Sequence, residues 1–492
     1  MTTLELNFLG IQMSFFKNLL KPADNHLLTS YLFLKLLALI YFVAFLSMAV
    51  QVTGLVGPNG ILPFQNILDN FYQHQGTSAW WKMPTLFWFS SNNLALHTVT
   101  ILGCAFSVLL FFGRWQRGSL ITLFILYLSL YHAGQTFLNF QWDTLLLECG
   151  FLAIFLVSGA SNLLIFLFHF LLFRLRFMSG VSKLASEDAS WSNFTALNYY
   201  FETQPLPHVG SWYFHQLPEW MLRTGTGFTF FTELIIPFFI FLPRRFRLIA
   251  AGVTLFMQLL IIATSNHNFV NLLTIILCIF LLDDKIVGRF IPKKSSLAKI
   301  KPNNWRNTFF TAITAVLIIS ASLPLFYSMV SGNKVTPWLA KSGMLVRSYG
   351  LGHIYHIFPT MQVERHELQV EGSYDGVNWQ AYTFRYKLGD LSARPKFIVP
   401  HQPRLDWMIW FVPPKSSSQM QWFTLFMRRL AEGSPQVLAL LKDNPFKNKP
   451  PKHLRVLVYR YHFTNGEERK QTGNWWKKEY LGEFPYVAPR RP

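Results

Sequence analysis

The sequence predicts an α-helical, multi-pass membrane domain of about eight or nine spans, followed by a β-rich, sandwich-like extramembrane head. Only 14% of the 492 residues are charged and 51% are hydrophobic, whereas about a quarter of residues are charged in soluble proteins. Long apolar runs recur as far as residue 330. Beyond that point, apolar and polar residues alternate, which is typical of β-strands. We therefore divide the chain into a membrane domain, 1–330, and a head, 331–492.

Nine apolar segments are candidates for membrane crossings, each of which needs roughly 20 apolar residues. Several segments are short or contain polar residues, so the expected count is eight or nine. The neighbouring pair 144–160 and 161–178 could form two crossings or one broken element. The segments lie near 31–50, 95–112, 119–135, 144–160, 161–178, 228–242, 248–264, 269–283 and 308–330.

Basic residues gather at alternate ends of these segments, most densely in 285–306, which holds seven Lys and Arg. Short loops rich in Lys and Arg stay on the cytoplasmic side, so nine crossings put the N-terminus inside and the head outside. The outer side then carries two long loops, 51–94 and 179–227. Three basic residues conflict with this topology, and an interfacial helix at the outer end would accommodate them. They are Arg174, Arg176 and Lys183.

The head carries strand and helix signals in turn. Alternating residues on both sides of Asp375-Gly376 predict a β-hairpin, because Asp-Gly is a strong turn signal between such runs. The run 453–464 alternates as well. Apolar residues at helical spacing within 420–442 predict a helical insertion. We expect these elements to form a sandwich-like module.

Familiar catalytic motifs do not occur in the sequence. It has no G-x-S-x-G elbow, no HExxH helix and no P-loop, and its three cysteines form no C-x-x-C pair. We therefore expect neither a cofactor nor a metal, and we favour a non-enzymatic role. The net charge of +20 lies largely at the ends of the apolar runs. It indicates membrane lipids as partners and no nucleic acid.

Three ionisable residues within the apolar segments are candidate catalytic groups, because charge inside a membrane is costly and is often functional. They are His132, Glu148 and Glu233. The alternative is a structural ion pair or hydrogen bond for each. Asp143 is a candidate helix cap, a position that Asp suits.

The head has a compact signature in which His401, Arg404, Asp406 and Trp407 lie within seven residues. On a strand, Arg404 and Asp406 would share one face, so we expect Arg404 to pair with Asp406 or with another carboxylate. The signature is either a structural corner or a site that binds a client protein. Its other members are Trp410, Trp475 and Trp476.

The chain resembles the lipase maturation factor family through several long stretches. They include FLKLLALIYFVAFLSMAVQVTGLVGPNGILPF, FLNFQWDTLLLECGFLA, NHNFVNLLTIILCIFLLDD and the head from Val370 through Trp476. The resemblance implies a membrane-bound folding factor with an exported client protein, such as a lipase. In animal members the head faces the lumen of the endoplasmic reticulum. Short loops and a head without cysteines also fit a bacterial member, with a periplasmic head at the inner membrane.

A weaker likeness to the spans of vitamin-K-dependent carboxylases keeps one alternative open. In that case the chain would be a membrane-embedded enzyme that acts on a lipid or a quinone-like substrate. Such an enzyme requires a cavity on which Glu148, Glu233 or His132 converge.

Overall fold

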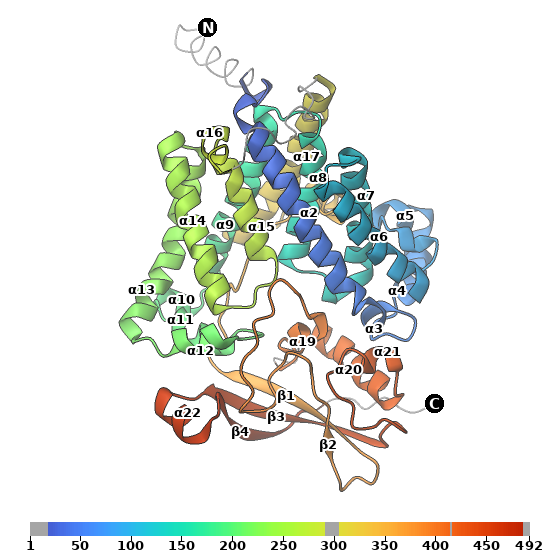
Figure 1. Ribbon diagram of the computed structural model, residues 1–492. Coiled ribbons are helices and arrows are strands. Elements are labelled where there is room, and N and C mark those ends of the chain that lie inside the picture. The colour runs from blue at the N-terminus through green and yellow to red at the C-terminus, as the bar shows by residue number, and fades with distance from the viewer. Residues whose placement is uncertain (1–17, 291–304, 414–415, 486–492) are drawn as a thin grey trace.

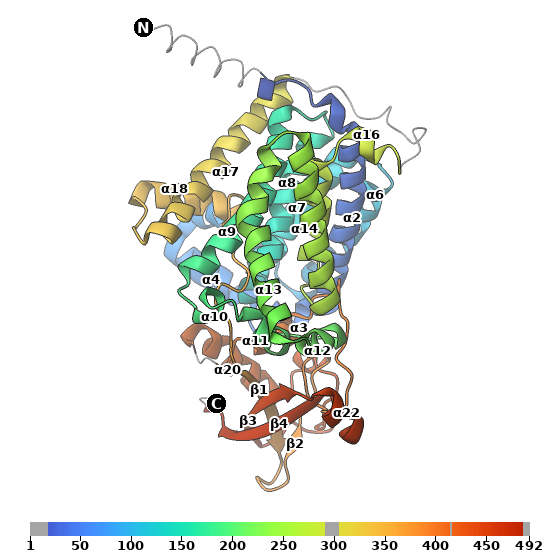
Figure 2. The ribbon, with the colours of Figure 1, turned by 90° about the vertical axis from the view of Figure 1, so that its left-hand side faces the viewer.

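The computed structural model describes residues 18–290, 305–413 and 416–485. Figure 1 shows a bundle of long helices stacked on a small sheet with short helices around it. Figure 2 shows the same two layers from the side, with the short helices α10, α11 and α12 between the bundle and the sheet. The predicted membrane domain and β-containing head are therefore both present.

The bundle follows the predicted apolar segments. Within the described ranges, seven helices are long and apolar enough to cross a membrane. The predicted spans 144–160 and 269–283 appear as shorter helices of 16 residues (α8) and 12 residues (Val270–Leu281). The helices are α2 (Leu27–Ala49), α6 (Asn93–Phe111), α7 (Gln116–Gly134), α8 (Gln141–Leu156), α9 (Asn162–Ala185), α13 (Glu219–Phe230) continued by η5 (Phe231–Ile235) and η6 (Ile236–Phe241), α14 (Arg244–Thr264), α15 (Val270–Cys278) continued by η7 (Ile279–Leu281), and α17 (Trp305–Ser331).

The pair that the sequence left open forms two separate helices, α8 and α9. Gly159 has a φ of 86°, a conformation that glycine adopts without steric cost, and the chain reverses there. Ser161 then caps α9, since its hydroxyl oxygen accepts a hydrogen bond from the Leu164 N–H at 3.2 Å. The chain therefore crosses the bundle twice in this region.

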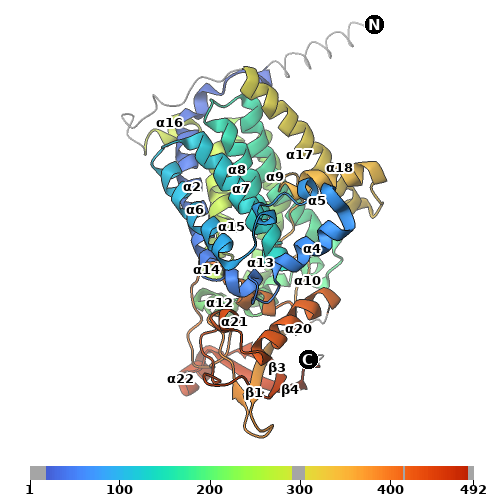
Figure 3. The ribbon, with the colours of Figure 1, turned by 90° about the vertical axis from the view of Figure 1, so that its right-hand side faces the viewer.

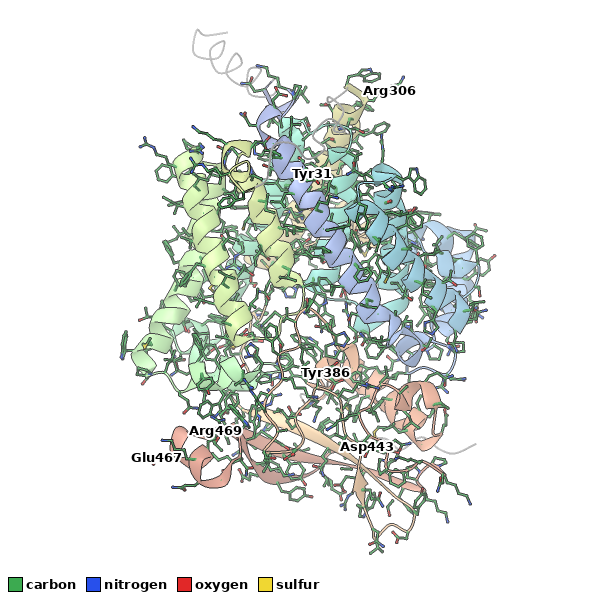
Figure 4. The ribbon with its side chains drawn as sticks, in the orientation of Figure 1. Tyr31, Arg306, Tyr386, Asp443, Glu467 and Arg469 are labelled. Carbon is green, nitrogen blue, oxygen red and sulfur yellow. The ribbon has the colours of Figure 1, made fainter. Side chains whose placement is uncertain are left out.

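Polar contacts bring together the helix ends that lie away from the head. Arg244 pairs with Asp283 (Nε–Oδ2, 2.5 Å), and the Asp284 carboxylate accepts the Leu27 N–H at 2.7 Å. Figure 4 shows Arg306 at this end of the bundle and Glu467 at the far end of the head. The basic residues predicted on one side therefore share one end. Those at 17, 293, 294, 299 and 301 lie outside the described residues.

The two long outer loops fold into short helices. Residues 51–94 form α3 (Val52–Val56), α4 (Phe64–Gln75), η2 (Gly76–Ser78), α5 (Ala79–Lys82) and η3 (Leu86–Trp88). Figure 3 shows α4 and α5 along the flank of the bundle. The second loop forms α10 (Ala189–Ser192), α11 (Ala196–Thr203) and α12 (Val209–His215). The expected interfacial helix around 174–183 is wrong, because these residues belong to the buried helix α9.

The head contains one four-stranded antiparallel sheet in the order β2-β1-β3-β4. The strands are β1 (Arg365–Ser373), β2 (Gln380–Ala381), β3 (His453–Phe463) and β4 (Trp476–Glu483). The predicted hairpin joins β1 to β2, with Glu371 opposite Ala381. The expected sandwich would have a second sheet packed on this one, but helices pack there instead. For example, the ring centroids of Phe423 on α20 and Phe484 beyond β4 are 6.1 Å apart. The head helices are α18 (Pro337–Ser348), α19 (Arg404–Ile409), α20 (Ser417–Ala431), α21 (Pro435–Leu438) and α22 (Gly466–Thr472).

The bundle and the head share buried apolar surface. One continuous cluster of buried side chains runs from Tyr41 and Leu147 in the bundle to Leu368 and Val456 in the sheet. A second cluster joins Trp212 of α12 to the end of the sheet. Contacting apolar side chains usually form one core per folding unit. The head is therefore packed against the bundle through a shared core, and it is not a separate module joined only by a linker.

Candidate functional site at the junction of bundle and head

The signature arginine of the head reaches into the bundle. Arg404 holds Asp143 of α8 in a two-pronged pair, with Nη1–Oδ2 and Nη2–Oδ1 both at 2.7 Å. The side chains of Arg404 and Asp143 are only 1% and 0% exposed. The Tyr127 hydroxyl donates to Asp143 Oδ1 at 2.6 Å, and Arg404 Nη1 also donates to the Phe137 carbonyl at 3.0 Å. This geometry is the fork that a guanidinium offers to a carboxylate.

Two expectations for this pair are corrected. Arg404 and Asp406 do not share a strand face, since they lie on helix α19, where residues two apart are turned by about 200°. Asp406 instead accepts the backbone N–H groups of Tyr386 at 2.7 Å and Lys387 at 2.9 Å. Asp143 is not a helix cap, because the N-cap of α8 is Phe140 and has no side-chain cap bond.

The residues before α19 fasten the head to the end of α2. His401 Nδ1 lies 2.9 Å from the Ser47 hydroxyl. The Gln51 amide donates to the Gln402 carbonyl at 2.8 Å, and its oxygen accepts the Arg404 N–H at 2.9 Å. Burial, with the nearby Arg404 and Arg385 charges, lowers the pKa of His401 to about 4. His401 is therefore neutral at physiological pH.

The signature tryptophans pack against the bundle and its outer loops. Trp407 meets Trp142 of α8 edge to face, with centroids 5.4 Å apart. The Trp410 indole donates to the Thr203 carbonyl of α11 at 2.6 Å. Such rings supply large buried area with a fixed geometry. Both therefore support the same junction as Arg404.

The second tryptophan pair, Trp475 and Trp476, lies where β4 begins. Trp475 meets Trp212 of α12 at 5.4 Å, and the Arg469 guanidinium, labelled in Figure 4, lies 3.5 Å from the Trp475 ring centroid. Trp476 stacks on Phe463 at 4.0 Å. The two groups of signature residues therefore bind the head to different outer helices.

The candidate catalytic residues also take part in contacts with residues 345–360. Glu148 pairs with Arg174 and accepts the Gly352 N–H at 2.9 Å. Arg174 donates to the His353 carbonyl at 2.9 Å. The His132 ring donates to the Ser348 carbonyl at 2.9 Å.

Glu233 lies between two cations of α9, the Lys183 ammonium at 2.8 Å and the Arg176 guanidinium at 3.6 Å. Lys183 also donates to the Ile357 carbonyl at 3.0 Å. The three basic residues that conflicted with the topology thus pair with two buried carboxylates, Glu148 and Glu233. The three catalytic candidates do not converge, because the cavity that Glu233 lines includes neither Glu148 nor His132.

Sequence reasoning missed a further buried group at the start of β1. Arg365 donates to the carbonyls of Glu202, Gln204 and Pro205 at 2.9, 2.5 and 3.0 Å, and it pairs with Glu367 at 2.5 Å. Its only sequence signal is that Arg365 and Glu367 share a strand face. Within the described residues, no group of three or more His, Cys, Asp or Glu side chains could hold a metal ion.

Comparisons with known proteins match both parts of the chain. A model described as lipase maturation factor transmembrane domain matches residues 28–289, and one described as lipase maturation factor C-terminal domain matches 349–486. Lipase maturation factor 2 of Xenopus laevis is 32% identical, over 94% of this chain and 82% of the relative. Lipase maturation factor 1 of Mus musculus is 31% identical, over 94% and 87%. No solved structure matches the chain.

Replacing Arg404 with Ala is expected to destabilise the full-length protein by roughly 3–5 kcal/mol, because Asp143 is left charged and buried. Arg404→Lys should also destabilise it, since Lys lacks the planar fork. The double variant Arg404→Met/Asp143→Leu should recover most of the loss. Chemical unfolding in detergent micelles measures these changes. Arg223→Ala, which removes an exposed pair with Glu219, is the control and should change stability by less than about 1 kcal/mol.

Acid is expected to loosen the junction through His401. The unfolded chain binds a proton at His401 below about pH 6.5, whereas the folded chain does so only near pH 4. Stability should therefore fall as pH drops from about 6.5 to 4. Melting temperatures across that range, compared between wild type and His401→Asn, isolate this contribution. An equal acid response in both proteins would contradict it.

Proposed function

Because the chain belongs to the lipase maturation factor family, we propose that its head and outer loops hold an exported lipase while that lipase folds. The membership makes it an integral membrane protein of the folding and maturation class. The observation that carries the proposal is that the family matches cover the bundle and the head alike. The chain thus has both parts, with a junction fixed by buried ion pairs.

We further propose that the head faces away from the cytoplasm. The supporting observation is that Arg117, Arg244 and Lys285 lie at the end of the bundle opposite the head. Lys and Arg in short loops are typical of the cytoplasmic side. In a eukaryotic host the membrane would be that of the endoplasmic reticulum, with a lumenal head. In a bacterial host it would be the inner membrane, with a periplasmic head.

The client surface that we propose is the basic outer end of the head. Residues 331–492 hold twenty-four Lys and Arg against twelve Asp and Glu. Several of these lysines are exposed. A basic surface attracts acidic partners and steers their approach, so we expect the client to present an acidic patch. The exposed lysines include Lys442, Lys447, Lys449 and Lys452 near the β1–β2 hairpin, and Lys470, Lys477 and Lys478 near the other end of β3.

The enzyme alternative has less support. Its motivation was a cavity on which the three ionisable candidates converge, and Glu148 and His132 are absent from the cavity that Glu233 lines. The names of the relatives describe lipase maturation.

Cysteine labelling tests the topology. In intact cells, or in sealed vesicles of known orientation, Thr472→Cys in the head should react with an impermeant thiol reagent added from the non-cytoplasmic side. Lys285→Cys at the opposite end should react only after the membrane is permeabilised. Both side chains are exposed, so access to the reagent depends on sidedness alone. The reverse labelling pattern would invert the model.

Charge reversal tests the client surface. The triple variant Lys447→Glu/Lys449→Glu/Lys452→Glu should lower the yield of secreted, active lipase several-fold in cells that lack their own maturation factors. Its melting temperature should stay near that of wild type, because these side chains are exposed. The charge-retaining triple Arg variant is the matched control. Equal lipase yield from the Glu and Arg variants would exclude this surface.

A further inference from the structure

A cavity of about 270 Å³ lies inside the bundle, on its outer half. It is lined by residues of α9, α11, α12, α13, η5, α14 and α15, and Figure 2 shows α9, α13 and α14 side by side. Its walls are mostly apolar, and they include Leu222, Phe228, Met257, Leu260 and Ile261. α13 and α14 carry exposed apolar residues such as Trp220 of α13 and Phe256 and Leu259 of α14. A membrane lipid therefore meets this part of the chain directly.

Charged side chains at the cavity do not balance. Arg176, Lys183 and Glu233 all line it, so two cations face one carboxylate. Lys183 is the closer partner of Glu233, at 2.8 Å against 3.6 Å for Arg176. In the part of the chain that the structure describes, the Nε of Arg176 has no hydrogen-bond partner. One buried positive charge is therefore left over on the cavity wall.

Two amides on the opposite wall also have unused hydrogen-bonding capacity. Asn271 donates to Gln258 Oε1 at 2.8 Å. Among the described residues, Gln258 Nε2 and Asn271 Oδ1 are left without partners although both side chains are buried. Unpaired buried polar atoms are rare in proteins. They indicate a polar group that enters this cavity.

The local backbone is shaped to bring the charges together. Glu233 lies in the π-helical turn η5, a distortion that is frequent at functional sites. Gly180 lets α9 approach η5, because a Cβ there would lie 2.9 Å from the Glu233 Cβ. The close approach places Arg176 and Lys183 on either side of the same carboxylate.

We propose that this cavity binds a membrane amphiphile that carries an anionic oxygen head group. The acyl chain lies along the apolar wall of α13 and α14. The anionic head group lies at Arg176, where it neutralises the surplus charge, and its oxygens receive hydrogen bonds from Arg176 and Gln258. A fatty-acid carboxylate and a phospholipid phosphate share this chemistry. The site is independent of the proposed client surface, which lies at the far end of the head.

Binding is tested on the full-length protein in a mild non-ionic detergent by native mass spectrometry. The probes are oleate, phosphatidylglycerol and phosphatidylcholine. Oleate or phosphatidylglycerol should bind with one-to-one stoichiometry and at least tenfold more tightly than phosphatidylcholine, and the better of the two identifies the head group. Equal retention of all three probes, as expected for annular lipid, would overturn the proposal.

Two variants test the position of the site. Arg176→Gln removes the surplus charge and leaves the Lys183–Glu233 pair intact, so it should abolish the preference for anionic probes. Ile261→Trp fills the apolar wall and should lower binding of every probe. Arg223→Gln, at an exposed arginine of α13 that does not line the cavity, is the control and should bind as wild type does. Melting temperatures confirm that each variant is folded. Unchanged binding by both folded cavity variants would also overturn the proposal.

Discussion

The pair between Arg404 and Asp143 is the contact on which the junction depends. Both side chains are buried, and a buried charge that loses its partner is strongly destabilising. Helix α19 must therefore stay seated on the end of α8 as long as Asp143 is ionised. The surrounding groups reinforce this constraint, because the Tyr127 hydroxyl donates to Asp143 and the Phe137 carbonyl accepts from Arg404. The head is thus held in one orientation relative to the bundle.

The same principle applies along the whole junction. The bundle carries basic residues on the outer half of α9, where charge is costly. Carboxylates of other helices pair with them, and backbone carbonyls of the segment after α18 accept further hydrogen bonds from Arg174 and Lys183. Gly352 donates to Glu148, and the carbonyls of His353 and Ile357 accept from Arg174 and Lys183. Removing the head would leave these groups exposed or unpaired. The head is therefore part of the charge balance of the bundle.

Local sequence patterns predicted the helices and strands well. They did not predict which side chains pair over long distances in the sequence. The apolar runs predicted the helices of the bundle, and Asp375-Gly376 predicted the hairpin between β1 and β2, because both signals act over a few residues. The partner of Arg404 lies 261 residues earlier, and no local pattern indicates it. The spacing of Arg404 and Asp406 also led to a wrong prediction. Two residues apart, they would share one face of a strand, but the buried apolar residues between and after them favour the short helix α19. The basic residues of α9 likewise led to the wrong prediction of an interfacial helix. Their carboxylate partners, Glu148 and Glu233, lie on other helices, so no local pattern shows that these charges are paired.

Hydrogen exchange of the full-length protein tests most directly whether the head and the bundle form one unit through this pair. In wild type, the backbone amides of α19 should exchange as slowly as those at the start of α8. In Asp143→Asn, exchange should rise together in α19 and in the adjoining ends of α2 and α8, while the helix ends around Asp283 and Asp284 stay protected. Faster exchange confined to α8, with α19 unchanged, would contradict the account.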